Sequence, residues 1–314
     1  MKRLLIAGML ACAALAGSAA FGADNRFSFG YIAHPFGDAL TDESGLKDSL
    51  AAAGQANLAF VVIGGIKSGI EPCSDELYEQ RRSMLNQSRH GLVVSVSESD
   101  WSDCRYRDGR PAALERLHRI RELYFADDFS LGASRIPLTR QSANPKFRDY
   151  AENSRWEIGG IMFATINLPA NNNRYLDAAG RNSEFEDRLV ANHDWLQRVV
   201  MHAKRKQYAG IVFFCDGDPL YAGKEDGVKR DGFRETRRQI ITLAASYPGK
   251  ILIIHNQPAN GDKHKPHKSP TIRWKGNLGD LAVASDWTML LVTPSRPSVF
   301  TVASGKDAGA TDRK

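Results

Sequence analysis

The feature that most constrains the fold is a regular alternation of short apolar runs with longer amphipathic stretches. Short apolar runs are typical of buried strands, whereas apolar residues that recur with the period of a helix turn are typical of helices. Three strand–helix steps in a row predict a parallel sheet with right-handed crossovers. The predicted strands of this first half are 27–32, 58–63 and 91–96, and the predicted helices are 42–53, 74–87 and 111–124.

The second half repeats this alternation with more antiparallel character. A predicted strand over residues 158–166 begins with a glycine pair, and the longest predicted helix, over residues 183–206, follows it. These elements predict an α/β fold in which helices flank two stacked, mixed sheets. The remaining predicted strands are 211–215, 251–255, 271–274, 281–284, 289–292 and 299–302, with a further helix over 229–247.

The N-terminal segment is typical of a secretory signal peptide. Lys2 and Arg3 precede an apolar run over residues 4–20, which is too short for a comfortable membrane span. Residues 9–12 match the lipid-attachment motif poorly, which leaves a lipid anchor at Cys12 as a minor alternative. The small residues that follow the apolar run allow cleavage after Ala20, Gly22 or Ala23.

We therefore predict a signal peptide over residues 1–22, one domain over residues 23–303 and a disordered tail over residues 304–314. No later segment approaches the ~20 apolar residues of a spanning helix. The sequence thus predicts a periplasmic or secreted protein without stable membrane insertion.

Positive charge is spread along the chain. The formal net charge is +6, and cations gather only over residues 204–206 and 263–268. Scattered charge of this size does not indicate a nucleic-acid partner, and none is expected.

Three cysteines lie beyond the predicted signal peptide: Cys73, Cys104 and Cys215. An oxidising compartment favours their pairing and leaves one over. Cys215 lies inside an apolar run, where a thiol behaves as a small buried hydrophobe. We therefore predict a disulfide between Cys73 and Cys104.

Polar residues follow the predicted strands, and the carboxyl ends of parallel strands are the usual place for a site in an α/β fold. For Asp216 and Asp218 a structural role is as reasonable as a role in binding, because they flank Gly217 and aspartate and glycine are common in turns. The polar groups, in chain order, are His34 and Asp38, then Glu98 and Asp100, then Asn167, then Asp216 and Asp218, then His255 and Asn256.

Several strings in this order and spacing resemble the calcineurin-like metallophosphoesterases, in particular an exported bacterial branch. The resemblance covers roughly residues 27–302 and implies a four-layer αββα sandwich with two stacked mixed sheets. It also implies chemistry in which two divalent metals activate a water for attack on phosphorus. The strings are Gly65-Ile66-Lys67-Ser68-Gly69, Pro72-Cys73-Ser74-Asp75 with Tyr78 and Arg81, Asp100-Trp101-Ser102-Asp103-Cys104, Tyr150-Ala151-Glu152-Asn153-Ser154-Arg155-Trp156, Asn171-Asn172-Asn173 and Trp195-Leu196.

The chain departs from the family pattern at the metal ligands themselves. Ala33-His34 stands where the first aspartate is expected, and Gly65 replaces the aspartate that bridges both metals. Ser99 lies where an asparagine ligand is expected. His255 keeps the first histidine of the late motif, but the residues after it differ. Because glycine offers no ligand atom, loss of the bridging carboxylate should remove most of the affinity for a metal pair.

Two functional hypotheses follow from this combination. The leading one is an exported phosphoesterase-like protein with a degenerate metal site, either inactive without a cofactor or weakly active with one metal, that has a binding role through the old cleft. The second is an active metal-dependent phosphoesterase with Mn, Fe, Zn or Mg in a rearranged site. Its substrate would be a phosphate ester, and another small anion is an alternative ligand. The second hypothesis assigns the metal ligands to His34, Asp38, Glu98, Asp216 and His255, with Glu98 and His255 also catalytic.

Two weaker interpretations concern the C-terminal part. His264 and His267 have a ligand-like spacing, but they lie in a Lys/Pro-rich stretch typical of a surface loop. The basic loops would also suit a protein-interaction module, although the sequence identifies no protein partner.

Overall fold

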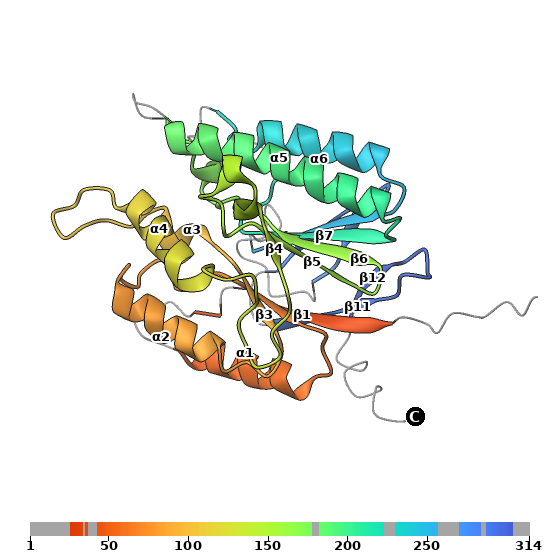
Figure 1. Ribbon diagram of the computed structural model, residues 1–314, viewed down its shortest axis with the longest axis horizontal. Helices are drawn as coiled ribbons and strands as arrows, with labels where there is room; N and C mark the ends of the chain where they lie inside the picture. The colour runs from red at the N-terminus through yellow and green to blue at the C-terminus, as the bar shows by residue number, and fades with distance from the viewer. Residues whose placement is uncertain are drawn as a thin grey trace, which may run out of the picture.

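Two mixed β-sheets lie face to face, with helices on the outer side of each (Figure 1). The predicted signal peptide and tail, together with His34 and Asp38, lie outside the described residues. The computed structural model describes residues 26–33, 35–36, 43–177, 182–222, 230–256, 270–283 and 287–303.

The first sheet has five strands in the order β12-β11-β1-β2-β3. Strands β1, β2 and β3 are parallel, β11 pairs antiparallel with β1, and β12 pairs antiparallel with β11. Helices α1, α2 and α4 pack against its outer face. The bounds are β1 (Phe27–Ala33), α1 (Ser44–Gln55), β2 (Val61–Gly64), α2 (Asp75–Leu85), β3 (Leu92–Ser95), α3 (Glu98–Trp101), α4 (Ala113–Tyr124), β11 (Trp287–Val292) and β12 (Phe300–Val302).

The second sheet has seven strands in the order β4-β5-β6-β7-β8-β10-β9. Its four central strands are parallel, and α5 and α6 cover its outer face on the side opposite to α1 and α2 (Figure 1). The bounds are β4 (Thr139–Arg140), β5 (Ser154–Ile158), β6 (Ile161–Thr165), α5 (Ser183–Arg205), β7 (Gly210–Cys215), α6 (Arg234–Ser246), β8 (Lys250–His255), β9 (Arg273–Lys275) and β10 (Leu278–Ala282), with short 3₁₀ turns η1 (Gln141–Ala143), η2 (Pro145–Phe147) and η3 (Asn172–Arg174).

An aromatic cluster fills the space between the two sheets. Phe29 and Phe60 of the first sheet stack with ring centroids 5.1 Å apart, and Phe60 meets Phe163 of the second sheet edge-on at 4.8 Å. Trp156 and Phe214 stack at 5.9 Å in the same cluster. Burying each such ring contributes roughly 1.5–3 kcal/mol, so this layer fixes how the ends of the two sheets face each other.

The prediction was wrong at the glycine pair. Gly159 and Gly160 do not open a strand over residues 158–166; they form the turn of a hairpin between β5 and β6. Both residues have positive φ, 57° and 77°, a conformation that glycine adopts without steric cost. Strand β5 was therefore missed, and β6 begins after the turn.

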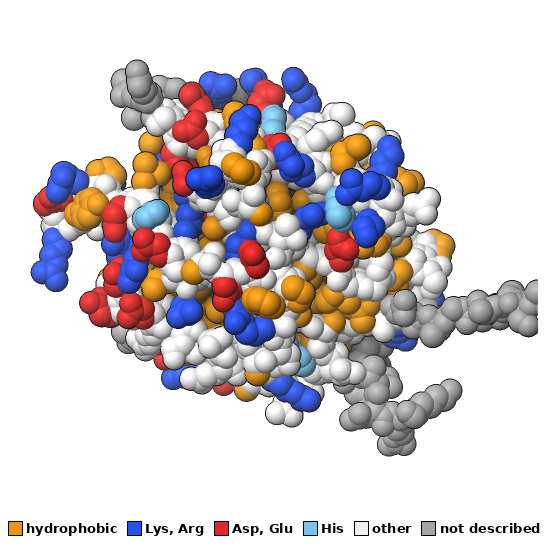
Figure 2. Space-filling model, viewed as in Figure 1, with side chains coloured by type: hydrophobic (Ala, Val, Ile, Leu, Met, Phe, Trp, Pro, Cys, Tyr) orange, Lys and Arg blue, Asp and Glu red, His pale blue; other side chains and the backbone are white. Residues whose placement is uncertain are grey.

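Charges of both signs are mixed over the visible face in Figure 2, where Lys and Arg side chains lie beside Asp and Glu. Partly exposed ion pairs of the protein include Arg119 with Asp75 and Arg198 with Asp194. No helix within the described ranges has the length and hydropathy needed to cross a bilayer.

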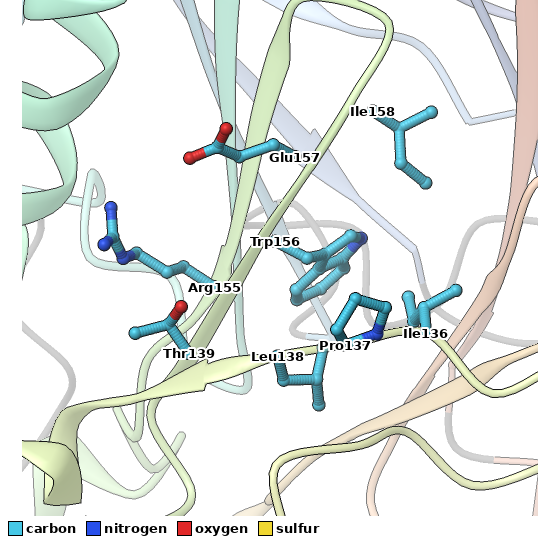
Figure 3. A pocket seen from close by; sticks show the side chains of 8 residues that line it. All are labelled: Ile136, Pro137, Leu138, Thr139, Arg155, Trp156, Glu157 and Ile158. Atoms are coloured by element: carbon cyan, nitrogen blue, oxygen red, sulfur yellow. The ribbon is translucent and has the colours of Figure 1, made fainter.

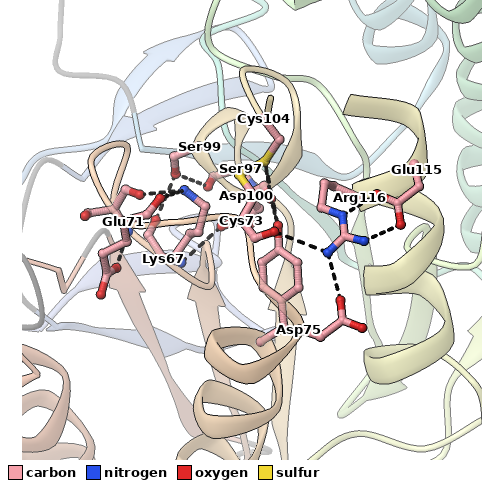
Figure 4. The surroundings of a disulfide bond; sticks show 12 residues. Lys67, Glu71, Cys73, Asp75, Ser97, Ser99, Asp100, Cys104, Glu115 and Arg116 are labelled. Atoms are coloured by element: carbon pink, nitrogen blue, oxygen red, sulfur yellow. Dashed lines mark hydrogen bonds and ion pairs between the residues drawn. A yellow bond between two sulfur atoms is a disulfide. The ribbon is translucent and has the colours of Figure 1, made fainter. Parts of the chain in front are cut away.

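The predicted disulfide is confirmed. Cys73 and Cys104 are bonded with their Cα atoms 5.8 Å apart (Figure 4). Cys215 is a buried free thiol. The bond joins the loop after β2 to the loop after α3, so it fastens together two of the segments that follow the parallel strands.

Replacing both Cys73 and Cys104 by serine should lower the free energy of unfolding by about 3–4 kcal/mol, because the unfolded chain regains the freedom of the closed loop. Urea denaturation measures this loss. The matched control, Cys215→Ala, removes a thiol that makes no cross-link and should cost only about 1 kcal/mol. Equal losses in both variants, or a peptide linking Cys73 to Cys215 in a non-reducing digest, would contradict the prediction.

Candidate functional site

A chain of buried hydrogen bonds joins the carboxyl ends of the two sheets. The hydroxyl of Tyr31 in β1 donates to Oδ1 of Asn256, which directly follows β8, at 2.6 Å. Nδ2 of Asn256 then donates to Oδ1 of Asp216, which directly follows β7, at 3.0 Å. The polar groups that sequence reasoning placed at separate strand ends therefore meet in one network.

Asp216 is the centre of this network and is fully buried. Its Oδ2 accepts hydrogen bonds from the backbone N–H of Glu98 at 2.7 Å and of Ala170 at 2.9 Å. With Asn256 on Oδ1, both carboxylate oxygens face N–H donors of the protein. Such donors stabilise the ionised form of the carboxylate.

The space beside Gly64 is filled by side chains of this network. A Cβ at position 64 would lie 2.3 Å from Oδ1 and 2.5 Å from Nδ2 of Asn256, and 2.7 Å from the hydroxyl of Tyr31. The absence of a side chain at Gly64 is thus what allows Asn256 to reach both Tyr31 and Asp216.

Gly65 is constrained in a second way. Its φ is +98°, a conformation that other residues rarely adopt, and a Cβ there would lie 2.8 Å from Oγ of Ser97. That hydroxyl also contacts Oγ of Ser99 at 2.8 Å. The position where the resemblance expects a bridging carboxylate therefore has neither the backbone conformation nor the room for one.

Asp100 holds the glycine turn and α3 together (Figure 4). It is fully buried, and its carboxylate accepts backbone hydrogen bonds from Ile66 at 2.7 Å, Lys67 at 3.1 Å and Ser97 at 2.7 Å. Burial raises the pKa of Asp100 to about 6, against the opposing effect of these hydrogen bonds and of Lys67. This carboxylate is a structural acceptor with no oxygen turned to a ligand.

Lys67 is buried in the same turn, with only 1% of its surface exposed. Its Nζ donates to the carbonyl oxygens of Ser68 at 2.8 Å and Glu71 at 2.9 Å. Burial lowers the pKa of Lys67, although the charges of Asp100 and Glu71 oppose this shift. The side chain braces the loop, so it is not available as a surface contact for an anion.

A second cluster lies beside the network and contains His255. Its Nε2 is 2.9 Å from Oδ1 of Asp280 in β10 and 3.8 Å from Oδ2 of Asp218, which follows β7. The ligand atoms of these three buried residues all lie within 4.8 Å of one another. Among the described residues, these three side chains are the group that could bind a metal ion. The predicted ligands Glu98 and Asp216 do not belong to this group.

Asp280 is the functional residue that sequence reasoning missed. Asp280 lies in β10 and pairs with Ile253 of the parallel strand β8. His255 comes two residues after Ile253 in β8, so the side chains of Asp280 and His255 lie on the same face of the sheet. Arg273 in β9 donates through Nε to its other oxygen at 2.9 Å. Burial acts to raise the pKa of Asp280, but the hydrogen bonds and charges of His255 and Arg273 outweigh it and lower that pKa. An acidic residue inside the apolar run 278–283 was the available signal.

The predicted site residues thus divide into three groups. His255 belongs to the metal-capable cluster, as the second hypothesis expected, although its partners are different. Asp216 lies in the hydrogen-bond network, and Glu98 is half-buried and contributes its backbone N–H to that network. His34 and Asp38 lie outside the described residues.

The sequence matches no protein-family model and no curated protein. The resemblance to the calcineurin-like metallophosphoesterases therefore stays a prediction. On the geometry alone, the described residues do not fit a two-metal centre, because Gly65 supplies no bridging ligand and the space beside it is filled by Ser97.

A separate hollow lies far from these clusters along the sequence, between β4 and β5 at the edge of the seven-stranded sheet (Figure 3). Its volume is about 330 Å³, and its walls are mostly apolar. It contains one acid and one base, Glu157 and Arg155, and Glu157 is already paired with His202 at 2.6 Å. The hollow offers contact area without a group poised for catalysis. The lining residues are Ile136, Pro137, Leu138, Thr139, Arg155, Trp156, Glu157 and Ile158.

Gly65→Ala should lower the free energy of unfolding by about 1–3 kcal/mol, because the new Cβ strains a positive-φ residue and presses on Ser97. The control is Gly54→Ala in α1, where an added Cβ meets nothing within 4 Å. That change should be neutral or stabilising by up to about 1 kcal/mol. Urea denaturation of both variants measures the difference, and a Gly65→Ala protein as stable as the wild type would contradict the close approach to Ser97.

Proposed function

We propose that this chain is an exported member of the calcineurin-like metallophosphoesterase superfamily whose two-metal centre has degenerated, and that it acts by binding rather than by two-metal hydrolysis. The observation that supports this most directly is the filled space beside Gly64 and Gly65. Asn256, Tyr31 and Ser97 occupy it with their own polar groups.

The proposed fold is a four-layer αββα sandwich. It is supported by two mixed sheets with a shared aromatic core and by helices on both outer faces. Export to the periplasm or the exterior is supported by the signal-peptide pattern of residues 1–22 and by the disulfide between Cys73 and Cys104, a bond favoured in oxidising compartments.

The proposed loss of hydrolysis rests on electrostatics. A pair of divalent cations a few ångströms apart repel each other, and a shared carboxylate between them is what makes the pair stable. At Gly65 that charge is missing, and the nearest polar atom is the neutral hydroxyl of Ser97. Asp216, the remaining carboxylate of the network, is neutralised by N–H donors from three different segments.

A second candidate function is favoured by one observation. His255 lies with two carboxylates in a cluster suited to a divalent ion, so a rearranged metal-dependent phosphoesterase remains the alternative proposal. In that case Asp218, His255 and Asp280 would hold the ion, which would supply Lewis acidity for a phosphate ester.

The two proposals differ in turnover. The leading one expects purified mature protein, supplied with Mn²⁺, to hydrolyse p-nitrophenyl phosphate and its bis-ester at less than about 0.01 s⁻¹, against the ~10 s⁻¹ typical of enzymes. An active two-metal phosphoesterase in the same buffer serves as the positive control. Mn²⁺-dependent turnover that His255→Ala abolishes would overturn the leading proposal and favour the alternative.

A further inference from the structure

Three neighbouring strands bring Asp218, His255 and Asp280 together. The strands β7, β8 and β10 are parallel and adjacent, and all three residues are buried. Zn²⁺ binds nitrogen and oxygen ligands at about 2.0–2.2 Å, which sets tetrahedral ligand atoms roughly 3.3–3.6 Å apart. The distances from Nε2 of His255, 2.9 Å to Asp280 and 3.8 Å to Asp218, lie on either side of that range.

Each carboxylate has one oxygen held by the protein and the other turned toward His255. Oδ1 of Asp218 accepts backbone hydrogen bonds from Leu220 at 2.8 Å and Tyr221 at 3.0 Å, while its Oδ2 is the oxygen nearer to His255. Oδ2 of Asp280 is held by Arg273, while its Oδ1 faces His255. Anchoring of this kind orients metal ligands from behind.

The imidazole of His255 is the nitrogen donor of the cluster. It is fully buried, and it is Nε2 that faces both carboxylates. Nδ1 lies on the opposite side of the ring, so an ion between the carboxylates would bind Nε2. If the proton is on Nδ1, the lone pair of Nε2 points at two carboxylate oxygens, which is the donor arrangement of a cation site.

We propose that Asp218, His255 and Asp280 bind a single divalent transition-metal ion, with Zn²⁺ or Mn²⁺ as the matching class. One imidazole and two carboxylates suit such ions, and solvent completes the coordination. Binding requires a neutral ring with its proton on Nδ1: a proton on Nε2 of the neutral ring moves to Nδ1, and a doubly protonated ring releases its Nε2 proton to solvent, so that Nε2 can donate its lone pair. This site stands whether or not the protein hydrolyses anything, because it needs neither the bridging carboxylate nor Asp216.

Metal binding to the full mature protein tests the proposal. Protein stripped with EDTA and dialysed should take up about one equivalent of Zn²⁺, measured by titration calorimetry and by metal content. Free Zn²⁺ at a hundred times its Kd should also raise the melting temperature, since a ligand at that excess stabilises the folded state by about 2.7 kcal/mol. Less than a fifth of an equivalent bound, with no change in melting temperature for Zn²⁺ or Mn²⁺, overturns the site.

Variants locate the ion. Asp218→Asn keeps an oxygen for the N–H groups of Leu220 and Tyr221, so it should fold, and it should weaken Zn²⁺ binding at least about tenfold. His255→Gln should weaken it at least about a hundredfold. The matched control is His202→Gln. His202 is also paired with a carboxylate, that of Glu157, but this pair lies outside the proposed site. That control should leave Zn²⁺ binding unchanged.

The stretch containing His264 and His267 provides a competing explanation for any uptake. The double variant His264→Gln, His267→Gln should keep full Zn²⁺ binding if the ion is held by the strand-end cluster. Loss of binding in that double variant, together with retention in Asp218→Asn, overturns the proposal. These experiments measure Zn²⁺ binding only. Their results are therefore independent of the turnover measurement that tests the proposed loss of hydrolysis.

Discussion

The arrangement of this molecule depends on how one buried carboxylate, Asp216, is neutralised. An unpaired carboxylate in the interior would cost several kcal/mol, and the protein avoids this with N–H groups from three segments. Those segments belong to different parts of the fold: Asn256 follows β8, Ala170 lies after β6, and Glu98 begins α3 beside the other sheet. Satisfying one charge therefore sets the spacing between the two sheets at their carboxyl ends.

The glycine pair after β2 and this network depend on each other. Gly64 leaves the room that the amide of Asn256 fills, and the amide in turn links Tyr31 to Asp216. Gly65 turns the backbone so that Asp100 can accept hydrogen bonds from the next two N–H groups. The two glycines and the polar groups around them thus form one hydrogen-bonded unit, in which protein N–H donors stabilise the buried carboxylates of Asp216 and Asp100.

Periodicity and local chemistry were enough to predict most strands, their parallel order in the first half and the pairing of Cys73 with Cys104. These features are decided by residues close together in the sequence or by whether a segment is apolar enough to be buried. The hairpin at Gly159 was misjudged because a glycine pair can either open a strand or reverse the chain, and only pairing with the strand before it decides. Asp280 could not be assigned from sequence, since its burial depends on Arg273 and His255, which lie on adjacent strands.

Asp216 and Asp218 show how two carboxylates in one short turn can have opposite roles. Asp216 has both oxygens engaged by N–H donors, and it is not part of the cluster around His255. Asp218 has one oxygen anchored by two backbone N–H groups and its other oxygen on the side of His255. Because Gly217 separates them, they reach different clusters from the same turn. The proposed site for a single ion and the hydrogen-bond network can therefore coexist, since the two depend on different carboxylates.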